Sequence, residues 1–212
     1  MKLYGYFRSS AAYRVRIALA LKGLPYEYAA VHLRRGEQRA AQYRALNAQE
    51  LVPTLDDDRG RFTQSLAIIE YLDERYPQPP LLPRTPEARA RVRAIALAIA
   101  CDIHPLDNLR VLQYLVDTVG ASDETKNAWY RHWIDVGLGA LESQLSRDPA
   151  TGTFCQGEAP TLADICLVPQ LANARRFGIP LDAYPRLLRI EAACNALPAF
   201  VAALPEKQPD AE

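Results

Sequence analysis

Residues 1–80 alternate short apolar runs with one strongly apolar helical run. The runs at 3–7 and 26–31 are typical of strands, and the stretch 12–22 between them is apolar on most faces, which predicts a buried helix. Gly23 is a plausible residue just beyond the end of this helix, and Pro25 prevents its continuation. A strand, a helix and a second strand in this order predict two parallel strands.

The next apolar residues surround Pro53, which cannot donate to a strand ladder and is therefore expected at the entrance of a third strand. A turn at 57–60 predicts that 54–57 and 61–63 form a hairpin. The following run, 66–72, has a strong helical pattern with Ser65 as its expected N-cap. This order of elements predicts an α/β thioredoxin-like domain over residues 1–82.

The second half of the chain has a helical pattern and follows a stiff, proline-dense linker at 78–84. Pro105 lies inside the first helical run and is expected to kink it. The tail from Pro205 is expected to be loose. An all-α domain over residues 86–212 is therefore predicted. Its expected helices cover 86–117, 123–146, a stretch that starts at Thr161 and ends near Gly178, and 185–203.

Composition and charge narrow the classes of function. Lysine plus arginine and aspartate plus glutamate number 25 each, so the formal net charge is zero and a general affinity for nucleic acid or an anionic membrane is not expected. No apolar run is long enough to cross a bilayer. The four cysteines form no C-x-x-C pair, which argues against a disulfide framework or a zinc site, and no metal is expected. A cytoplasmic protein with buried thiols is the simplest interpretation.

Candidate chemistry begins where the first strand meets the first helix, at Ser9 and Ser10. The N–H groups of a first helical turn lack backbone partners, and the helix dipole is positive there, so an anion or a thiolate would be stabilised. Taken alone, one serine is more simply the N-cap of a core helix. Ser65 marks a second polar helix start, and Gln64 before it has no expected capping role. Two such helix starts at one site would favour a ligand that carries carboxylates.

Polar residues of the helical half have simpler interpretations when taken alone. His104, Asp107, Asn108 and Arg110 surround the expected kink at Pro105, and a surface or satisfied core histidine is the more common case. Asp164, inside an apolar stretch, is interpreted as part of a capping box and not as a catalyst. The arginines at the end of the same helix complement its dipole.

Together these motifs, in this order and spacing, resemble the cytosolic glutathione transferases over the whole chain. Within them the chain is similar to the zeta class, which includes maleylacetoacetate and maleylpyruvate isomerases. The motifs are Ser9-Ser10-x-x-x-Arg14-Val15-Arg16-Ile17-Ala18-Leu19, Leu51-Val52-Pro53-Thr54-Leu55, Gln64-Ser65-x-Ala67-Ile68-Ile69-Glu70-Tyr71-Leu72, Asp102-Ile103-His104-Pro105-Leu106-Asp107-Asn108, Thr161-Leu162-Ala163-Asp164 and Ala174-Arg175-Arg176-Phe177.

The resemblance implies a thioredoxin-like domain followed by an all-helical domain, a homodimer, glutathione as cofactor and a cis peptide bond before Pro53. It implies that Arg8 and Arg176 bind the carboxylates of a small dicarboxylic substrate, a task that suits the planar, charged guanidinium. Some helical-domain residues would reach the cofactor either across the dimer interface or from the helical domain itself. The implied glutathione contacts are Gln49, Val52, Pro53, Gln64, Ser65, His104, Asn108 and Arg110.

The implied reaction is cis–trans isomerisation by reversible addition of the glutathione thiol to a double bond. Ser9 is predicted to activate the thiol and Ser10 to assist, whereas Ala11 stands where the family commonly has cysteine or, in some members, threonine. The same thiol would also serve conjugation, peroxide reduction or dehalogenation, and a non-catalytic glutathione-binding protein is a third reading. The residues do not choose between maleylacetoacetate and maleylpyruvate.

Overall fold

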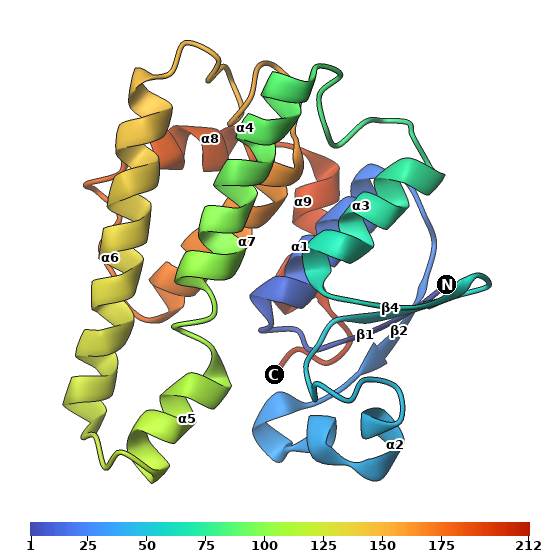
Figure 1. Ribbon diagram of the computed structural model, residues 1–212, viewed down its shortest axis with the longest axis vertical. Coiled ribbons are helices and arrows are strands. Elements are labelled where there is room, and N and C mark those ends of the chain that lie inside the picture. Colours follow the sequence, from blue (N-terminus) through green and yellow to red (C-terminus); the bar gives the residue numbers. More distant parts are fainter. The chain divides into compact units, whose positions relative to one another are not determined.

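The computed structural model describes residues 1–212, which form two compact units (Figure 1). The first unit contains Met1–Leu81 together with Asn195–Glu212, and the second contains Leu82–Cys194. The proline-dense linker thus contains the boundary between the units. The final residues group with the N-terminal unit, whereas the sequence placed them with the helical half.

A four-stranded sheet in the order β2-β1-β3-β4 forms the centre of the first unit. Strands β1 (Lys2–Gly5) and β2 (Glu27–Ala30) are parallel, as the strand–helix–strand pattern predicts. Strands β3 (Thr54–Asp57) and β4 (Gly60–Thr63) form the predicted antiparallel hairpin. β3 also pairs antiparallel with β1, so β1 lies between one parallel and one antiparallel neighbour.

Helices α1 (Ser10–Leu21) and α3 (Ser65–Arg75) pack against each other in the first unit. A short helical segment, with 3₁₀ turns at Leu33–Arg35 and Glu37–Arg39 and α2 (Ala41–Arg44), lies on the opposite side of the sheet (Figure 1). Gly23 follows α1 in the left-handed conformation, with φ +64°, as expected for that position.

The N-cap of α3 differs by one residue from the prediction. Gln64 is the N-cap, and Ser65 is already the first helical residue. Ser65 is buried, and its hydroxyl accepts a hydrogen bond from Arg14 Nη1 at 3.3 Å, so it is engaged by another helix and does not cap its own. The tertiary contact with α1 therefore overrides the local capping preference of serine.

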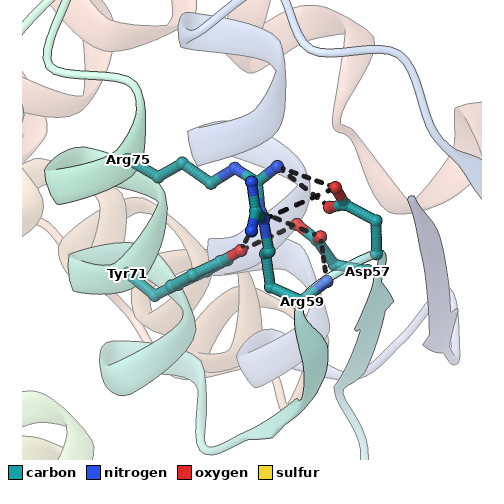
Figure 2. Close-up of polar contacts among 5 residues, drawn as sticks. Asp57, Arg59, Tyr71 and Arg75 are labelled. Carbon is teal, nitrogen blue, oxygen red and sulfur yellow. Dashed lines mark hydrogen bonds and ion pairs between the residues drawn. The ribbon is translucent and has the colours of Figure 1, made fainter.

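A polar cluster anchors the far end of α3 to the β3–β4 hairpin (Figure 2). Tyr71 donates to Asp57 Oδ2 at 2.9 Å, and Arg75 Nη1 contacts Asp57 Oδ1 at 3.1 Å. The second guanidinium nitrogen pairs with Asp58 at 2.9 Å. Burial alone would raise the pKa of Asp57, but the hydrogen bonds from its neighbours and the charge of Arg75 lower it overall.

The second unit is all-helical, as predicted, but its first long helix is interrupted. An α-helix ends at Leu97, a π-helical turn covers Ala98–Ile103, and a new helix starts only at Leu109. Pro105 therefore breaks the helix, because it lacks an N–H and clashes with the preceding turn. The α-helices of this unit are α4 (Pro86–Leu97), α5 (Leu109–Asp117), α6 (Asp123–Arg147), α7 (Leu162–Arg176) and α8 (Pro185–Asn195).

The predicted capping box at the start of α7 is present. The Asp164 carboxylate accepts from Thr161 N at 2.8 Å and from the Thr161 hydroxyl at 2.9 Å. Its other oxygen accepts from Cys155 N at 2.8 Å. Asp164 is fully buried, which raises its pKa despite these hydrogen bonds. It therefore holds a loop and a helix start together, in line with its interpretation as a folding residue.

The C-terminal region departs from the sequence prediction in two places. The expected single helix is divided into α8 and α9 (Pro198–Ala202), because Pro198 can start a helix but cannot continue one. The tail beyond Pro205, expected to be loose, instead forms a 3₁₀ turn at Pro205–Lys207 and hydrogen-bonds to the sheet unit. Its contacts come from acidic side chains that hydrophobic patterning does not detect.

All four cysteines are free thiols. Three of them are buried, whereas Cys101 is exposed, contrary to the expectation of buried thiols. None of the helices is both long and apolar enough to cross a membrane. No group of three or more histidine, cysteine or acidic side chains is placed to hold a metal ion.

Candidate functional site

The strand register brings three predicted site segments to one edge of the sheet. Tyr4 of β1 pairs with Thr54 of β3, and Thr54 pairs with Thr63 of β4. The residues just beyond these pairs therefore lie next to one another: the turn after β1, the Val52–Pro53 step before β3, and Gln64 after β4. The parallel and antiparallel pairings together explain why residues far apart in sequence converge here.

Ser9 is the N-cap of α1, and its Oγ accepts a hydrogen bond from Ala12 N at 3.2 Å. A hydroxyl that accepts one hydrogen bond still has its own proton to donate. Ser10 is the first helical residue and only 4% exposed, while Ser9 is partly exposed. Of the two serines, Ser9 is thus the more accessible hydroxyl at a positively polarised helix start.

The backbone before Pro53 is held by two side chains. Leu51 O accepts hydrogen bonds from the Tyr43 hydroxyl at 2.7 Å and from Asn47 Nδ2 at 2.8 Å. Val52 packs in a buried cluster with Tyr6 and Phe7, next to the start of α1. The Val52–Pro53 peptide bond is cis, as the resemblance implies.

The start of α3 has a different construction from that of α1. Gln64 makes no side-chain cap, and its backbone is in the positive-φ region at +68°. Its side-chain Nε2 instead donates to Gln49 Oε1 at 2.9 Å. The first turn of α3 thus has no side-chain cap, and two amide side chains sit together beside it. This is a suitable arrangement for an anionic ligand with further polar groups.

Two buried arginines of α1 were not identified as structural by the sequence analysis. Arg14 is 1% exposed and donates to Ser65, so it ties α1 to the start of α3. Arg16 is fully buried and donates to Phe7 O at 3.1 Å and to Ala203 O at 3.1 Å. The sequence did contain a signal for this role, because both arginines lie in a helix that is apolar on most faces. A buried charge on such a helix needs hydrogen-bond partners.

The second unit carries its own group of predicted binding residues around the break at Pro105. Asn108 is the N-cap of α5, with its Oδ1 accepting from Arg110 N at 3.1 Å. His104 is half-buried and Arg110 is exposed. Trp129 Nε1 donates to Leu106 O at 2.8 Å and fixes this turn to α6.

Asp107 lies in the same turn and is only 9% exposed. Neither of its carboxylate oxygens has a hydrogen-bond partner. Burial without compensation raises the pKa of Asp107 to about 7. The sequence placed this residue in the polar cluster but contained no signal that it would be buried and unpaired.

Arg176 is the last residue of α7 and is exposed. Its guanidinium carbon lies 5.3 Å from the centre of the Phe177 ring, and Phe177 stacks on Tyr130 at 3.7 Å between ring centres. Burial raises the pKa of Tyr130, and the nearby Asp107 adds to this effect, while Arg176 opposes it. Arg175, in contrast, pairs with Glu191 of α8 and has a structural role.

The predicted site residues thus form two groups, one in each unit. The first unit joins Arg8, Ser9 and Ser10 with the Val52–Pro53 step and the Gln49–Gln64–Ser65 group at one sheet edge. The second unit joins His104, Asn108 and Arg110 around one helix break and carries Arg176 at the end of α7. The first group combines a partly exposed hydroxyl, an uncapped helix start and paired amides, which suits a peptide-like anion with a thiol.

Comparisons with known proteins agree with this architecture. Residues 3–80 match the family model of the glutathione S-transferase N-terminal domain. The chain is 56% identical to a probable maleylacetoacetate isomerase of Vibrio cholerae, with 99% of this chain and 97% of that protein covered.

Two solved structures are similar over their full length. A holo structure of a maleylpyruvate isomerase, described as a bacterial zeta-class glutathione S-transferase, is 50% identical with a TM-score of 0.98 and complete coverage of both chains. A maleylacetoacetate isomerase from Methylobacterium extorquens AM1, with bound malonate and glutathione, is 44% identical with a TM-score of 0.98 and the same coverage. The chain therefore belongs to the zeta class of the glutathione S-transferases, the family of the maleylacetoacetate and maleylpyruvate isomerases.

Proposed function

We propose that this protein is a glutathione-dependent cis–trans isomerase of maleylacetoacetate or of the closely related maleylpyruvate, acting in the breakdown of aromatic compounds. The observation that carries the proposal is the full-length similarity to isomerases of this class, at 56% identity for the Vibrio cholerae relative. The bound glutathione and malonate of the Methylobacterium extorquens relative support a thiol cofactor and a dicarboxylic substrate.

Three features of the first unit support the proposal that glutathione binds there. The uncapped start of α3 offers N–H groups to a carboxylate, and the Gln49–Gln64 pair offers amide groups beside it. Ser65 stands at the same helix start, and Val52 would use its backbone to pair with the cysteinyl part of the cofactor. Arg14, which donates to Ser65, keeps this helix start in place.

Glutathione bound here would supply a thiol for reversible addition to the cis double bond of the substrate. Ser9 would stabilise the thiolate by donating a hydrogen bond from its hydroxyl, whose oxygen already accepts the Ala12 N–H. The positive end of α1 acts in the same direction. Ser10 is buried in the first turn of α1, and we propose that it has the smaller, assisting role. Ala11 has no side-chain donor, so the hydroxyl function falls to the serines.

Arg8 and Arg176 are assigned to the two carboxylates of the substrate. Each guanidinium carbon lies over a phenylalanine ring, Arg8 at 4.9 Å from Phe7 and Arg176 at 5.3 Å from Phe177. An aromatic face restricts the orientation of the planar fork, and a guanidinium held in this way suits the binding of a carboxylate. His104, Asn108 and Arg110 remain proposed cofactor contacts from the helical unit or across a dimer interface.

The proposal also includes the assembly and location of the protein, which we expect to be a homodimer in the reducing cytoplasm. Large apolar side chains such as Leu97 on α4 and Val136 on α6 are exposed, at 45% and 53%, which supports a subunit interface on the helical unit. The four free thiols, all in the second unit, support a reducing compartment. Analytical ultracentrifugation tests the assembly: a species of twice the chain mass is expected, and a monomer at micromolar concentration contradicts it.

The deciding experiment mixes the protein with glutathione and each cis acid and follows the appearance of the trans isomer. Turnover is expected with at least one substrate, and the ratio of the two kcat/KM values identifies the preferred one. Turnover of neither acid refutes the proposed function. Omission of glutathione is the control, and it should abolish the reaction.

The competing function is conjugation of apolar electrophiles by the same thiol. Arg176→Ala separates the two, because loss of a carboxylate contact should lower isomerase kcat/KM by about 10- to 100-fold and leave conjugation of an apolar electrophile unchanged. Arg147→Ala, which removes an exposed arginine at the end of α6, is the matched control. Equal activity of Arg176→Ala and wild type toward the diacid would remove Arg176 from the site.

A further inference from the structure

The tail that follows α9 is anchored to the sheet unit at several points. Gln208 is buried, and its side-chain amide donates to Ala202 O at 3.2 Å and to Leu204 O at 2.8 Å. Further on, Glu212 pairs with His32 at 2.8 Å and with Arg35 at 3.1 Å. The tail is therefore held at both ends, and one of the three residues between these anchors contacts the segment after β1.

That residue is Asp210, whose Oδ2 accepts a hydrogen bond from Phe7 N at 3.0 Å. Phe7 lies two residues beyond the end of β1 and two residues before the N-cap of α1, so its N–H has neither a strand ladder nor a helix to donate to. A buried backbone N–H without a partner is costly, and the tail supplies the missing acceptor. The contact links residues 203 positions apart in the chain.

The carbonyl of Phe7 is held from the other side by Arg16. Arg16 also donates to Tyr6 O at 3.5 Å, and the backbone N–H of Ser9 donates to Tyr6 O at 2.9 Å. Both backbone polar groups of Phe7 thus have charged side-chain partners, an acceptor from the tail and a donor from α1. Charge-assisted hydrogen bonds of this kind are stronger than neutral ones.

Asp210 is itself oriented by a second donor. The Tyr28 hydroxyl of β2 donates to the same Oδ2 at 3.3 Å, and burial together with the nearby carboxylate raises the pKa of Tyr28. The other oxygen, Oδ1, is buried and accepts no hydrogen bond. A buried carboxylate oxygen without a hydrogen bond costs free energy. The other oxygen accepts from both β2 and the turn after β1, so we infer that the side chain serves to hold that turn.

We propose that Asp210 is a positioning residue of the reaction, which acts through the Phe7 backbone to set the positions of Arg8 and Ser9. The consequence for activity rests on the roles that the proposed function gives to those two residues. Arg8 and Ser9 directly follow Phe7 in the chain. Loss of the Phe7 contact would therefore increase the mobility of both side chains at once. Misplacement of reacting groups by about 1 Å can cost on the order of 100-fold in rate.

Hydrogen–deuterium exchange of the free protein tests the contact without any ligand. In Asp210→Ala, peptides that cover residues 6–10 are expected to exchange about tenfold faster, while the rest of the sheet keeps its protection. Glu206→Ala is the matched control, since it removes an exposed acidic side chain from the same tail. Unchanged exchange of residues 6–10 in Asp210→Ala overturns the proposal.

Steady-state kinetics then test the consequence. Asp210→Ala is expected to lower kcat about tenfold and to change the KM for glutathione less than about threefold, because the cofactor contacts Gln49, Gln64 and Ser65 lie on other segments. Glu206→Ala should match the wild type. Faster exchange with an unchanged kcat overturns the positioning role, since a purely structural residue would lower only the melting temperature.

Asp210→Asn provides the conservative variant. An asparagine keeps an acceptor oxygen for Phe7 N but loses the charge, so kcat and exchange are expected to lie between the wild type and the alanine variant. If the alanine variant does not fold, this variant decides: wild-type exchange together with wild-type kcat overturns the proposal. Absence of turnover by the wild type refutes the proposed function instead, and the exchange result then decides the positioning of the turn.

Discussion

Two aspartates with buried carboxyls, one in each unit, have opposite surroundings. The Asp57 side chain is fully buried at the β3–β4 hairpin and accepts from Tyr71, Arg75 and its own turn (Figure 2). Asp107, in the turn between α4 and α5, is also buried but has no partner for either oxygen. The pKa of Asp57 is lowered, whereas that of Asp107 is raised to about 7.

In the first unit the site segments are held by hydrogen bonds within the protein, whereas in the second unit the charge of a buried carboxyl depends on pH. At the sheet edge of the first unit, the predicted ligand-binding segments are held by hydrogen bonds within the protein, such as Gln64 to Gln49 and Arg14 to Ser65. Around the helix break of the second unit, a carboxyl group titrates near neutral pH. Activity and stability are therefore expected to change on substitution in the first region, and stability is expected to change with pH as well in the second.

The largest effect is expected from the start of α1. Ser9→Ala removes the hydroxyl that the proposed function uses as a donor, and kcat should fall by about 100-fold, as with loss of one donor from an oxyanion hole. The absorbance of the bound glutathione thiolate at neutral pH should fall as well. Ser10→Ala is the matched control, with a small effect expected from a buried first-turn residue. The reverse result would assign activation to Ser10.

A second prediction concerns the strained start of α3. Gln64→Gly relieves a positive φ that costs on the order of 1 kcal/mol in a non-glycine residue, so the free energy of unfolding should rise by about that amount. At the same time the amide pair with Gln49 is lost, and the KM for glutathione should rise about tenfold. Chemical denaturation and kinetics measure the two effects. A more stable variant with an unchanged KM would remove Gln64 from the cofactor site.

The third prediction uses the raised pKa of Asp107. The folded protein keeps the proton of Asp107 up to about pH 7, whereas the unfolded chain loses it near pH 4, so wild-type stability should fall as the pH rises between these values. Asp107→Asn removes this titration, and its melting temperature should exceed that of the wild type by a few degrees more at pH 8 than at pH 5. A constant difference across this range would contradict an unpaired carboxyl.

The smallest effect, with the opposite sign of pH dependence, is expected for Asp57. Its pKa is lowered in the folded state, so its contribution to stability is complete at neutral pH and is lost as the pH falls below about 4. Asp57→Asn should lower the melting temperature at pH 7, and the deficit should shrink in acid. Asp58→Asn, which removes an exposed partner of Arg75, is the matched control with a smaller loss.

Much of the fold could be predicted because local physics and tertiary structure agree there. Pro53 must open a strand since it lacks an N–H, Asp164 must cap a helix since it follows threonine at the capping-box spacing, and Gly23 must end α1. The misses occur where a distant contact decides. Ser65 is not the N-cap of α3 because Arg14 engages it, and the tail after α9 is ordered because Asp210 contacts Phe7.

The candidate site shows the same division. Side-chain chemistry at helix starts pointed to Ser9 and Gln64 as candidates, whereas the substrate-binding role of Arg176 came only from the family resemblance. The loose tail was a wrong expectation, since one acidic side chain among polar residues does not reveal a distant acceptor role. Asp107 was part of a recognised cluster, but its lack of partners depends on how α6 and the turn pack.

Local sequence patterns sufficed to predict the order of strands and helices and most helix ends, because periodicity, proline, glycine and capping side chains act over a few residues. The candidate reacting groups came largely from the resemblance of whole motifs to the glutathione transferases, not from these local patterns. The tertiary structure alone decided which buried charges have partners: Arg14 with Ser65, Asp210 with Phe7, and Asp107 with none. Such pairings join residues far apart in the chain, and only the folded backbone brings their donors and acceptors within hydrogen-bond distance.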